Sequence, residues 1–163
     1  NAKTGLNDMI DFIGQTIDVG KSTILEKWSY AGDSTEIFAK RFKKVVAVDP
    51  WQAGYDKNDI KEVEASFDER LKDFANVIKK KMTGKEYFET HQNKFDVIYI
   101  DALHTYESVK TDIEMFLPRV KVFICGHDYQ DKFPGVKQAV TELKKEIKRF
   151  ADTSWAIKLW EIK

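Results

Sequence analysis

Residues 95–106 are the most informative stretch of the chain and read Phe95-Asp96-Val97-Ile98-Tyr99-Ile100-Asp101-Ala102-Leu103-His104-Thr105-Tyr106. Its apolar first half predicts a buried strand that ends at Asp101, and His104 follows three residues later. In an open parallel sheet, ligands bind just beyond the carboxyl ends of the strands. A short turn that carries a carboxylate and an imidazole is therefore a candidate site of chemistry.

Strands and helices alternate along the whole chain. Short apolar runs predict strands at 22–29, 45–48, 76–82, 95–101, 121–126 and 154–162. Apolar residues at helical spacing predict helices over 6–18, from 34 onward, and over 59–74, 85–91, 106–117 and 134–150. This alternation is typical of a parallel sheet with helices on both faces. We therefore predict one α/β domain over 1–163, with a Rossmann-like, mostly parallel sheet of about six strands.

The composition argues against several classes of protein. The 163 residues include 27 Lys and Arg and 27 Asp and Glu, so the formal net charge is zero. Nucleic acids and anionic membranes bind to clustered positive charge, so we expect neither partner. No apolar run approaches the ~20 residues of a membrane span, and no signal-peptide pattern opens the chain. We expect a cytoplasmic protein with a trimmed or processed start at Asn1 and a buried thiol at Cys125.

The segment Gly20-Lys21-Ser22-Thr23 resembles the end of a phosphate-binding P-loop. The full pattern needs a glycine, four residues, and then Gly-Lys-Ser/Thr, and Gly14 lies one residue too far away. A P-loop also follows a strand and opens a helix, whereas this segment follows a predicted helix and precedes a predicted strand. We interpret it as a helix end with a polar turn.

Polar residues follow each predicted strand and should converge on one edge of the sheet. The first strand ends at Glu26 and a loop over 29–33, the second at Asp49, and the later two at Asp101 and at 126–128. Acidic residues there suit ribose hydroxyls or a cation, and the helix start at Asp33 or Ser34 suits an anionic group. Purely structural roles also stay open for the same positions: the carboxylate could cap a helix, and the histidine could have no catalytic role.

These blocks resemble the class I S-adenosylmethionine-dependent methyltransferases, in particular the branch with macrolide-sugar O-methyltransferases and related bacterial proteins. The matching segments carry the residues Leu25-Glu26, Ser29-Tyr30-Ala31-Gly32-Asp33-Ser34-Thr35, Val46-Ala47-Val48-Asp49-Pro50-Trp51, Tyr99-Ile100-Asp101-Ala102, His104-Thr105-Tyr106-Glu107, Gly126-His127-Asp128-Tyr129 and Pro134-Gly135-Val136. The blocks at 99–107 and 126–129 are the specific ones. The similarity extends over nearly the whole chain.

The resemblance implies a role for each site residue. The cofactor S-adenosylmethionine would be bound by Glu26, Ser29, Tyr30, Gly32, Ser34, Asp49, Trp51 and Asp101, with Asp49 on the ribose hydroxyls. Asp101 and Asp128 would hold a divalent cation, for which magnesium is expected because the ligands are oxygens. His104 would be the general base that takes the proton of the acceptor hydroxyl. For His127, a ligand role and a structural role stay equally open.

The sequence departs from the family pattern at Lys27-Trp28. The family has an apolar residue and then a glycine there, and glycine lets the backbone approach the cofactor closely. A tryptophan side chain could fill that space, and a buried lysine carries a desolvation cost. An altered loop path, weakened cofactor binding and a fold that no longer methylates are the three explanations.

We therefore predict a metal-assisted O-methyltransferase that acts on a hydroxyl of a small molecule or sugar. The alternative is a catalytically degenerate methyltransferase-fold module that acts in binding or scaffolding. A nucleotide-binding oxidoreductase is disfavoured because no G-x-G-x-x-G opens a helix. The sequence leaves open whether the chain forms a homo-oligomer.

Overall fold

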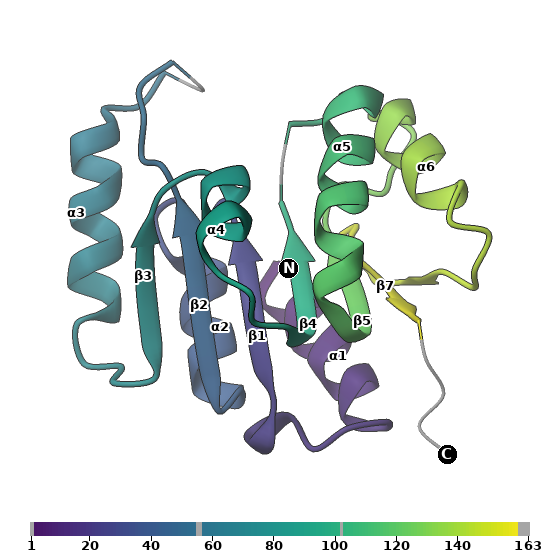
Figure 1. Ribbon diagram of the computed structural model, residues 1–163, viewed down its shortest axis with the longest axis horizontal. Helices are drawn as coiled ribbons and strands as arrows, with labels where there is room; N and C mark the ends of the chain where they lie inside the picture. The colour runs from purple at the N-terminus through teal and green to yellow at the C-terminus, as the bar shows by residue number, and fades with distance from the viewer. Residues whose placement is uncertain (1, 55–56, 102, 160–163) are drawn as a thin grey trace.

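A seven-stranded sheet organises the structure, a computed structural model that describes residues 2–54, 57–101 and 103–159 (Figure 1). The strands lie in the order β3-β2-β1-β4-β5-β7-β6. Their bounds are β1 (Thr23–Lys27), β2 (Lys44–Asp49), β3 (Val77–Lys81), β4 (Phe95–Ile100), β5 (Val120–Gly126), β6 (Lys148–Arg149) and β7 (Trp155–Lys158). The first five strands are parallel, and the last two are antiparallel to their neighbours. The predicted α/β fold is confirmed, with one strand more than expected.

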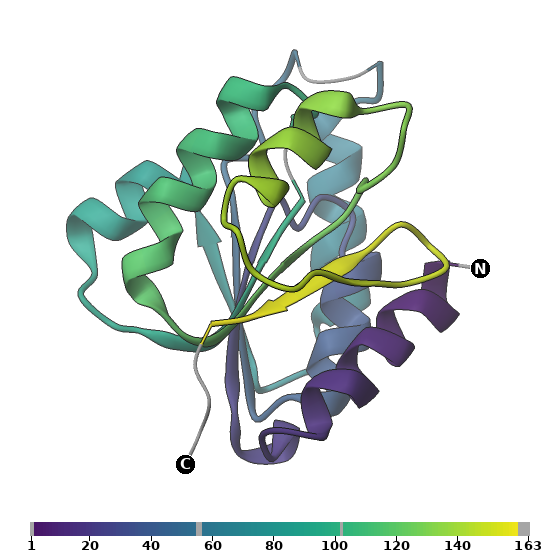
Figure 2. The same cartoon turned by 90° about the vertical axis from the view of Figure 1, so that its right-hand side faces the viewer.

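Six α-helices cover the two faces of the sheet in the described part of the chain. They are α1 (Ala2–Gly14), α2 (Asp33–Arg41), α3 (Ile60–Leu71), α4 (Gly84–Thr90), α5 (Tyr106–Phe116) and α6 (Pro134–Thr141), and the short 3-10 helices η1 (Val19–Lys21) and η2 (Leu117–Arg119) join them. The first three helices contribute to one hydrophobic cluster and the last three to the other. Figure 2 shows α1 on one side of the sheet and α5 on the other.

Successive residues of each central strand face opposite clusters, as the pleat of a strand requires. In β4, Val97 and Tyr99 pack against the α1–α3 side, whereas Ile98 and Ile100 pack against the α4–α6 side. Both sets are apolar because a parallel sheet is covered on both faces. This alternation fixes where the polar residues at the ends of the strands point.

Two details differ from the sequence-based expectations. The predicted helix over 134–150 ends at Thr141, because Lys144 adopts a φ of 53° and the chain then turns back into β6. Ile147 and Phe150 still pack on the core, but from the hairpin. The N-cap of α2 is Gly32, at a φ of 87°, rather than Asp33 or Ser34. The Ser34 hydroxyl donates to Glu26 instead of capping the helix.

Other expectations hold at the ends of the elements. The segment over 20–23 follows α1 and η1 and leads into β1, so it lacks the context of a P-loop. Pro134 occupies the first turn of α6. Residue 102 and the last residues of the predicted strand over 154–162 lie outside the described residues. Among the helices that are described, none has the length and apolar character to cross a bilayer.

Candidate functional site

The topology brings the ends of the parallel strands to one edge and creates a crevice in the middle of the sheet. From β1 the chain proceeds outward to β2 and β3, and from β4 it proceeds the other way to β5. β1 and β4 are therefore neighbours at the point where the strand order reverses. Open α/β sheets bind ligands at such a switch point. The residues after β1, β2, β4 and β5 consequently form the candidate site.

Three predicted site residues meet after β4 and β5. Asp101, His104 and Asp128 each offer one ligand atom, and these three atoms lie within 4.8 Å of one another. His104 Nε2 is 2.6 Å from Asp128 Oδ2, and the imidazole stacks on Phe133 with ring centroids 3.9 Å apart. The His104 side chain is 42% exposed, so it is held in place yet reachable from solvent.

A second imidazole extends this cluster into the protein. His127 Nδ1 lies 3.1 Å from Asp128 Oδ1, and its Nε2 lies 3.7 Å from Asp152 Oδ2. The Asp152 side chain is only 3% exposed, and its other oxygen accepts a hydrogen bond from the backbone N–H of Ser154. Carboxylates and imidazoles thus alternate in the order Asp152, His127, Asp128 and His104.

Burial and mutual charge shift the acidity of this cluster. Burial raises the pKa of Asp101 to about 6, with the positive charge of His127 acting in the opposite direction. Burial also raises the pKa of Asp128, but the hydrogen bond and charge of His127 and the charge of His104 outweigh it, so that this pKa is lowered. Burial lowers the pKa of His127, whereas the hydrogen bond that it donates to Asp128 and the charges of nearby carboxylates raise it above the usual value. Such opposed shifts are typical of functional sites.

The loop after β1 is organised around a buried glutamate. Glu26 lies under the start of α2, and its carboxylate accepts hydrogen bonds from the hydroxyls of Ser34 and Thr35. Burial raises the pKa of Glu26 to about 7, although these hydroxyls partly offset the effect. Gly32 has a positive φ and packs directly under Leu71, where any Cβ atom would clash. Glu26 and Gly32 therefore shape the loop from behind.

Lys27 points to the opposite face of the sheet from Glu26. Its Nζ is 2.5 Å from Asp112 Oδ1 of α5, and the two side chains are 15% and 5% exposed. The ion pair explains how the strand tolerates a lysine near its end, because an unpaired buried charge would be costly. Trp28 follows with a φ of 68°, a backbone conformation that favours glycine.

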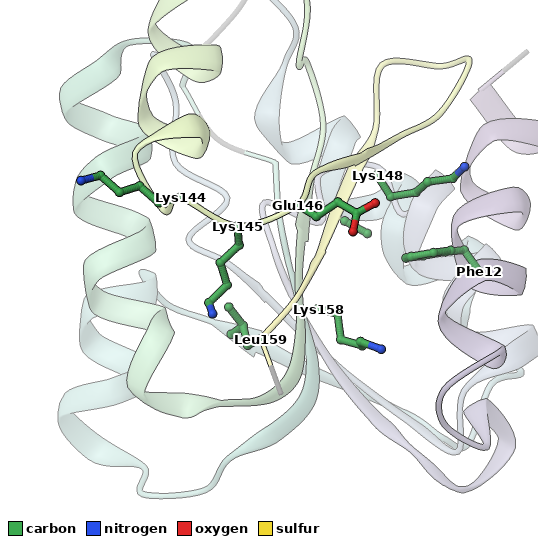
Figure 3. A pocket seen from close by; sticks show the side chains of 8 residues that line it. Phe12, Lys144, Lys145, Glu146, Lys148, Lys158 and Leu159 are labelled. Carbon is green, nitrogen blue, oxygen red and sulfur yellow. The ribbon is translucent and has the colours of Figure 1, made fainter. Parts of the chain in front are cut away.

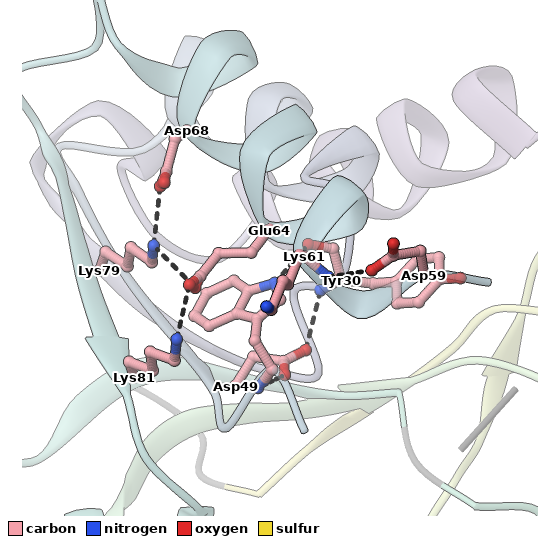
Figure 4. Close-up of polar contacts among 9 residues, drawn as sticks. Tyr30, Asp49, Asp59, Lys61, Glu64, Asp68, Lys79 and Lys81 are labelled. Carbon is pink, nitrogen blue, oxygen red and sulfur yellow. Dashed lines mark hydrogen bonds and ion pairs between the residues drawn. The ribbon is translucent and has the colours of Figure 1, made fainter. Parts of the chain in front are cut away.

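Asp49 ties the loops after β1 and β2 together (Figure 4). Its two oxygens accept hydrogen bonds from the backbone N–H groups of Tyr30 and Trp51, at 3.0 and 2.7 Å. The Trp51 indole donates to the Tyr30 carbonyl and is 4% exposed, packed between Phe67 and the Lys79 ammonium group. Trp51 thus lies beneath the loops rather than in the crevice.

Acidic side chains form ion pairs with lysines of the edge strand β3. Lys79 contacts Glu64 and Asp68, and Lys81 contacts Glu64 (Figure 4). Hydrogen bonding from Lys81 and the charge of Lys79 hold the pKa of Glu64 below its usual range, despite some desolvation. These ion pairs neutralise the charges of Lys79 and Lys81 at this edge of the sheet.

A cavity of about 520 Å³ lies at the switch point, within the ~300–1,000 Å³ range of cofactor sites. Four of the predicted cofactor residues line it, namely Ser29, Tyr30, Ser34 and Asp101. Glu26, Gly32, Asp49 and Trp51 do not line it and instead support its walls. Trp28 lines this cavity and also a smaller one of about 220 Å³ beside Lys27, Pro50 and Gly84. Its side chain is therefore part of the wall between the two cavities.

Sequence reasoning missed three features of the site. Phe133 stacks on His104, and no local pattern predicts that these two residues meet. Asp112 carries no signal that it would meet Lys27 across 85 residues. Asp152 could have been noticed, because an aspartate two residues before Ser154 is typical of a tight turn.

One family of proteins matches this chain by sequence. The sequence model of a family described as a methyltransferase domain matches residues 25–129, more than half of the chain. Among curated proteins, no sequence matches this chain.

Solved structures share the fold at low sequence identity. An rRNA methylase from Streptococcus thermophilus has 16% identity and a TM-score of 0.66, with 98% of this chain and 97% of that chain covered. The O-methyltransferase TomG from Streptomyces achromogenes, in complex with SAM, has 12% identity and a TM-score of 0.66, with 99% and 81% covered. The N-methyltransferase NodS from Bradyrhizobium japonicum has 14% identity and a TM-score of 0.62, with 93% and 92% covered.

Proposed function

We propose that this chain, which belongs to the class I S-adenosylmethionine-dependent methyltransferases, methylates a hydroxyl of a small molecule or sugar with the help of a divalent cation. The observation that carries the proposal is the cluster of Asp101, His104 and Asp128 beside the 520 Å³ cavity. A base next to a cofactor-sized cavity can assist methyl transfer to a hydroxyl, and two carboxylates beside it can hold a cation.

His104 is the proposed general base. Asp128 accepts a hydrogen bond from Nε2, which leaves Nδ1 as the nitrogen that takes the proton from the acceptor hydroxyl. An aspartate that holds one imidazole nitrogen fixes both the tautomer and the orientation of the ring. The stacked Phe133 ring restricts the imidazole further. The proton moves from the hydroxyl to Nδ1 as the oxygen takes the methyl group.

Asp101 and Asp128 are the proposed ligands of the cation. Both present carboxylate oxygens, which magnesium prefers, and His104 is left for the proton. Bound there, the cation would stabilise the developing alkoxide. Including the imidazole as a third ligand would instead favour a transition metal.

Radiolabelled methyl transfer tests the mechanism directly. With sugar and catechol acceptors, we expect turnover that chelation of the cation lowers and that His104→Ala lowers by about 100-fold. The matched control is His91→Ala, because His91 stacks on Tyr87 away from the site. Equal turnover in the two variants would remove His104 from the role of base.

The acceptor is the finer part of the proposal. The three neighbours are described as acting on rRNA, on oxygen and on nitrogen, so the shared fold leaves the acceptor open. An oxygen acceptor is supported here by the base and the paired carboxylates. A cytoplasmic location stays a prediction, and whether the chain forms a homo-oligomer stays open.

A degenerate module that binds without methylating is the second candidate. One observation favours it: Trp28 occupies the wall between the two cavities at a positive φ. Both Asp49 oxygens are also engaged by backbone N–H groups. A folded chain that ignores both the methyl donor and its demethylated product would establish this alternative.

A further inference from the structure

A second groove lies at the other edge of the sheet, away from the predicted site residues (Figure 3). It has a volume of about 490 Å³ and is lined by Phe12, Lys144, Lys145, Glu146, Lys148, Ala156, Lys158 and Leu159. Four of these eight residues are lysines, and all four lysines are exposed. The cluster is notable because the chain as a whole has no net charge.

The groove exists because β6 is short. β6 pairs with β7 only at Trp155 and Ala156, whereas β5 pairs with β7 as far as Lys158. Before β6 the chain turns at Lys144, so the segment over 144–147 leaves the sheet. Within the described residues, Ile157 and Lys158 therefore have a strand partner on one side alone. An open strand edge is a template for pairing with another extended segment.

The charges at this edge are not neutralised within the described residues. None of the four lysines forms an ion pair with a described acidic group, whereas Lys79 and Lys81 on the opposite edge are paired. Among the described residues of the lining, Glu146 is the single acidic one. Phe12, Ala156 and Leu159 add an apolar surface to the groove. Lysines disfavour pairing with a neutral strand or another copy, and they favour an acidic strand.

We propose that an extended, acidic peptide segment of a partner protein binds in this groove as an added strand beside β7. Its backbone would pair with the open edge at Lys158, whose N–H and C=O face away from β5, as in other strand-addition complexes. Its carboxylates would contact Lys145, Lys148 and Lys158, and its apolar side chains would contact Phe12 and Leu159. The proposal is independent of methyl transfer.

The test is a fluorescence anisotropy titration of the 163-residue chain with a labelled peptide of alternating glutamate and valine. A peptide of alternating lysine and valine and a short oligouridylate are the competing probes. Charge reversal in the groove, by Lys145→Glu with Lys158→Glu, should weaken binding of the acidic peptide at least about tenfold. Lys94→Glu is the matched control, because Lys94 is exposed and lies outside the groove.

Amide hydrogen exchange separates strand addition from simple charge attraction. Binding of the acidic peptide should slow exchange at Lys158, whose strand edge becomes paired. The proposal is overturned if the acidic peptide does not bind at millimolar concentration, or if it binds without protecting that edge. Tighter binding of the oligouridylate, abolished by the same charge reversal, would overturn it in favour of a nucleic-acid surface.

Discussion

The two halves of the strand-end crevice use polar residues in opposite ways. In the acceptor half, which comprises Asp101, His104, His127 and Asp128, the titratable groups face one another. Around the cofactor half, the polar groups of Lys27, Asp49 and Trp51 are engaged by α5 or by the loop backbone. The acceptor half therefore leaves its titratable groups available to a ligand, whereas the polar groups around the cofactor half hold the surrounding loops in place.

Breaking the ion pair under the cofactor half should have the largest effect. Asp112→Asn keeps the shape of the side chain but leaves Lys27 unpaired, so we expect a loss of about 3–5 kcal/mol in the free energy of unfolding. Urea denaturation measures it. Glu89→Gln removes one partner of the exposed pair with Lys85 and should cost little.

A loss for Asp112→Asn as small as that of Glu89→Gln would show that Lys27 reaches solvent without its partner. The double variant Lys27→Met with Asp112→Leu should recover most of the stability, because it removes both charges at once.

The second-largest expected effect comes from Glu26, which lies behind the cofactor loop, and it concerns how the free energy of unfolding depends on pH. Its pKa is about 7 when folded against 4.5 for a free side chain, so the folded state binds the proton more tightly. The stability contributed by this group is therefore present below pH 4.5 and is lost as the pH rises to about 7. The shift corresponds to about 3 kcal/mol.

Glu26→Gln stays uncharged and can still accept a hydrogen bond from Ser34 or Thr35. Urea denaturation across this pH window should show a flatter stability profile for the variant, and greater stability than the unaltered chain above pH 7. The exposed Glu62→Gln should keep the original slope. Parallel profiles for Glu26→Gln and the unaltered chain would mean that Glu26 is not buried as described.

Opening the wall between the two cavities should have the smallest effect of the three. Trp28→Gly removes the indole, and glycine readily adopts the positive φ at this position. We therefore expect S-adenosylhomocysteine to bind about tenfold more tightly, which corresponds to about 1.4 kcal/mol of binding free energy. Lys144→Gly also relieves a positive φ but lies outside the crevice, and it should leave this affinity unchanged. Weaker binding by Trp28→Gly would show that the indole contacts the ligand instead of obstructing it.

The sequence predicts the sheet, the helices and the turn after β4 because each depends on local patterns. The apolar run of β4 and the helical spacing in α5 are visible over a few residues. The predicted helix over 134–150 extends beyond the observed end of α6 for a physical reason. Ile147 and Phe150 continue the apolar stripe of the helix in the sequence, but in the structure they are packed on the core from a hairpin. An apolar repeat in the sequence indicates that its residues are buried, but it does not distinguish a helix from a hairpin that buries the same residues.

The tertiary partners of the site could not be predicted in this way. His104 meets Asp128 from 24 residues away, and Lys27 meets Asp112 from 85 residues away. Whether Lys27 is a defect or a paired charge depends on that distant contact. Likewise, Asp49 looks free in the sequence, but its oxygens are engaged by two loops that only the fold brings together.

Calorimetric titration of the unaltered chain with S-adenosylhomocysteine shows whether the cavity at the switch point binds the cofactor. We expect saturable binding at one site, with heat that disappears when Ser29→Trp blocks the cavity between the loop over 29–34 and Asp101. A folded sample that shows no binding at millimolar ligand would contradict it. The acceptor half would then have no methyl donor to work against.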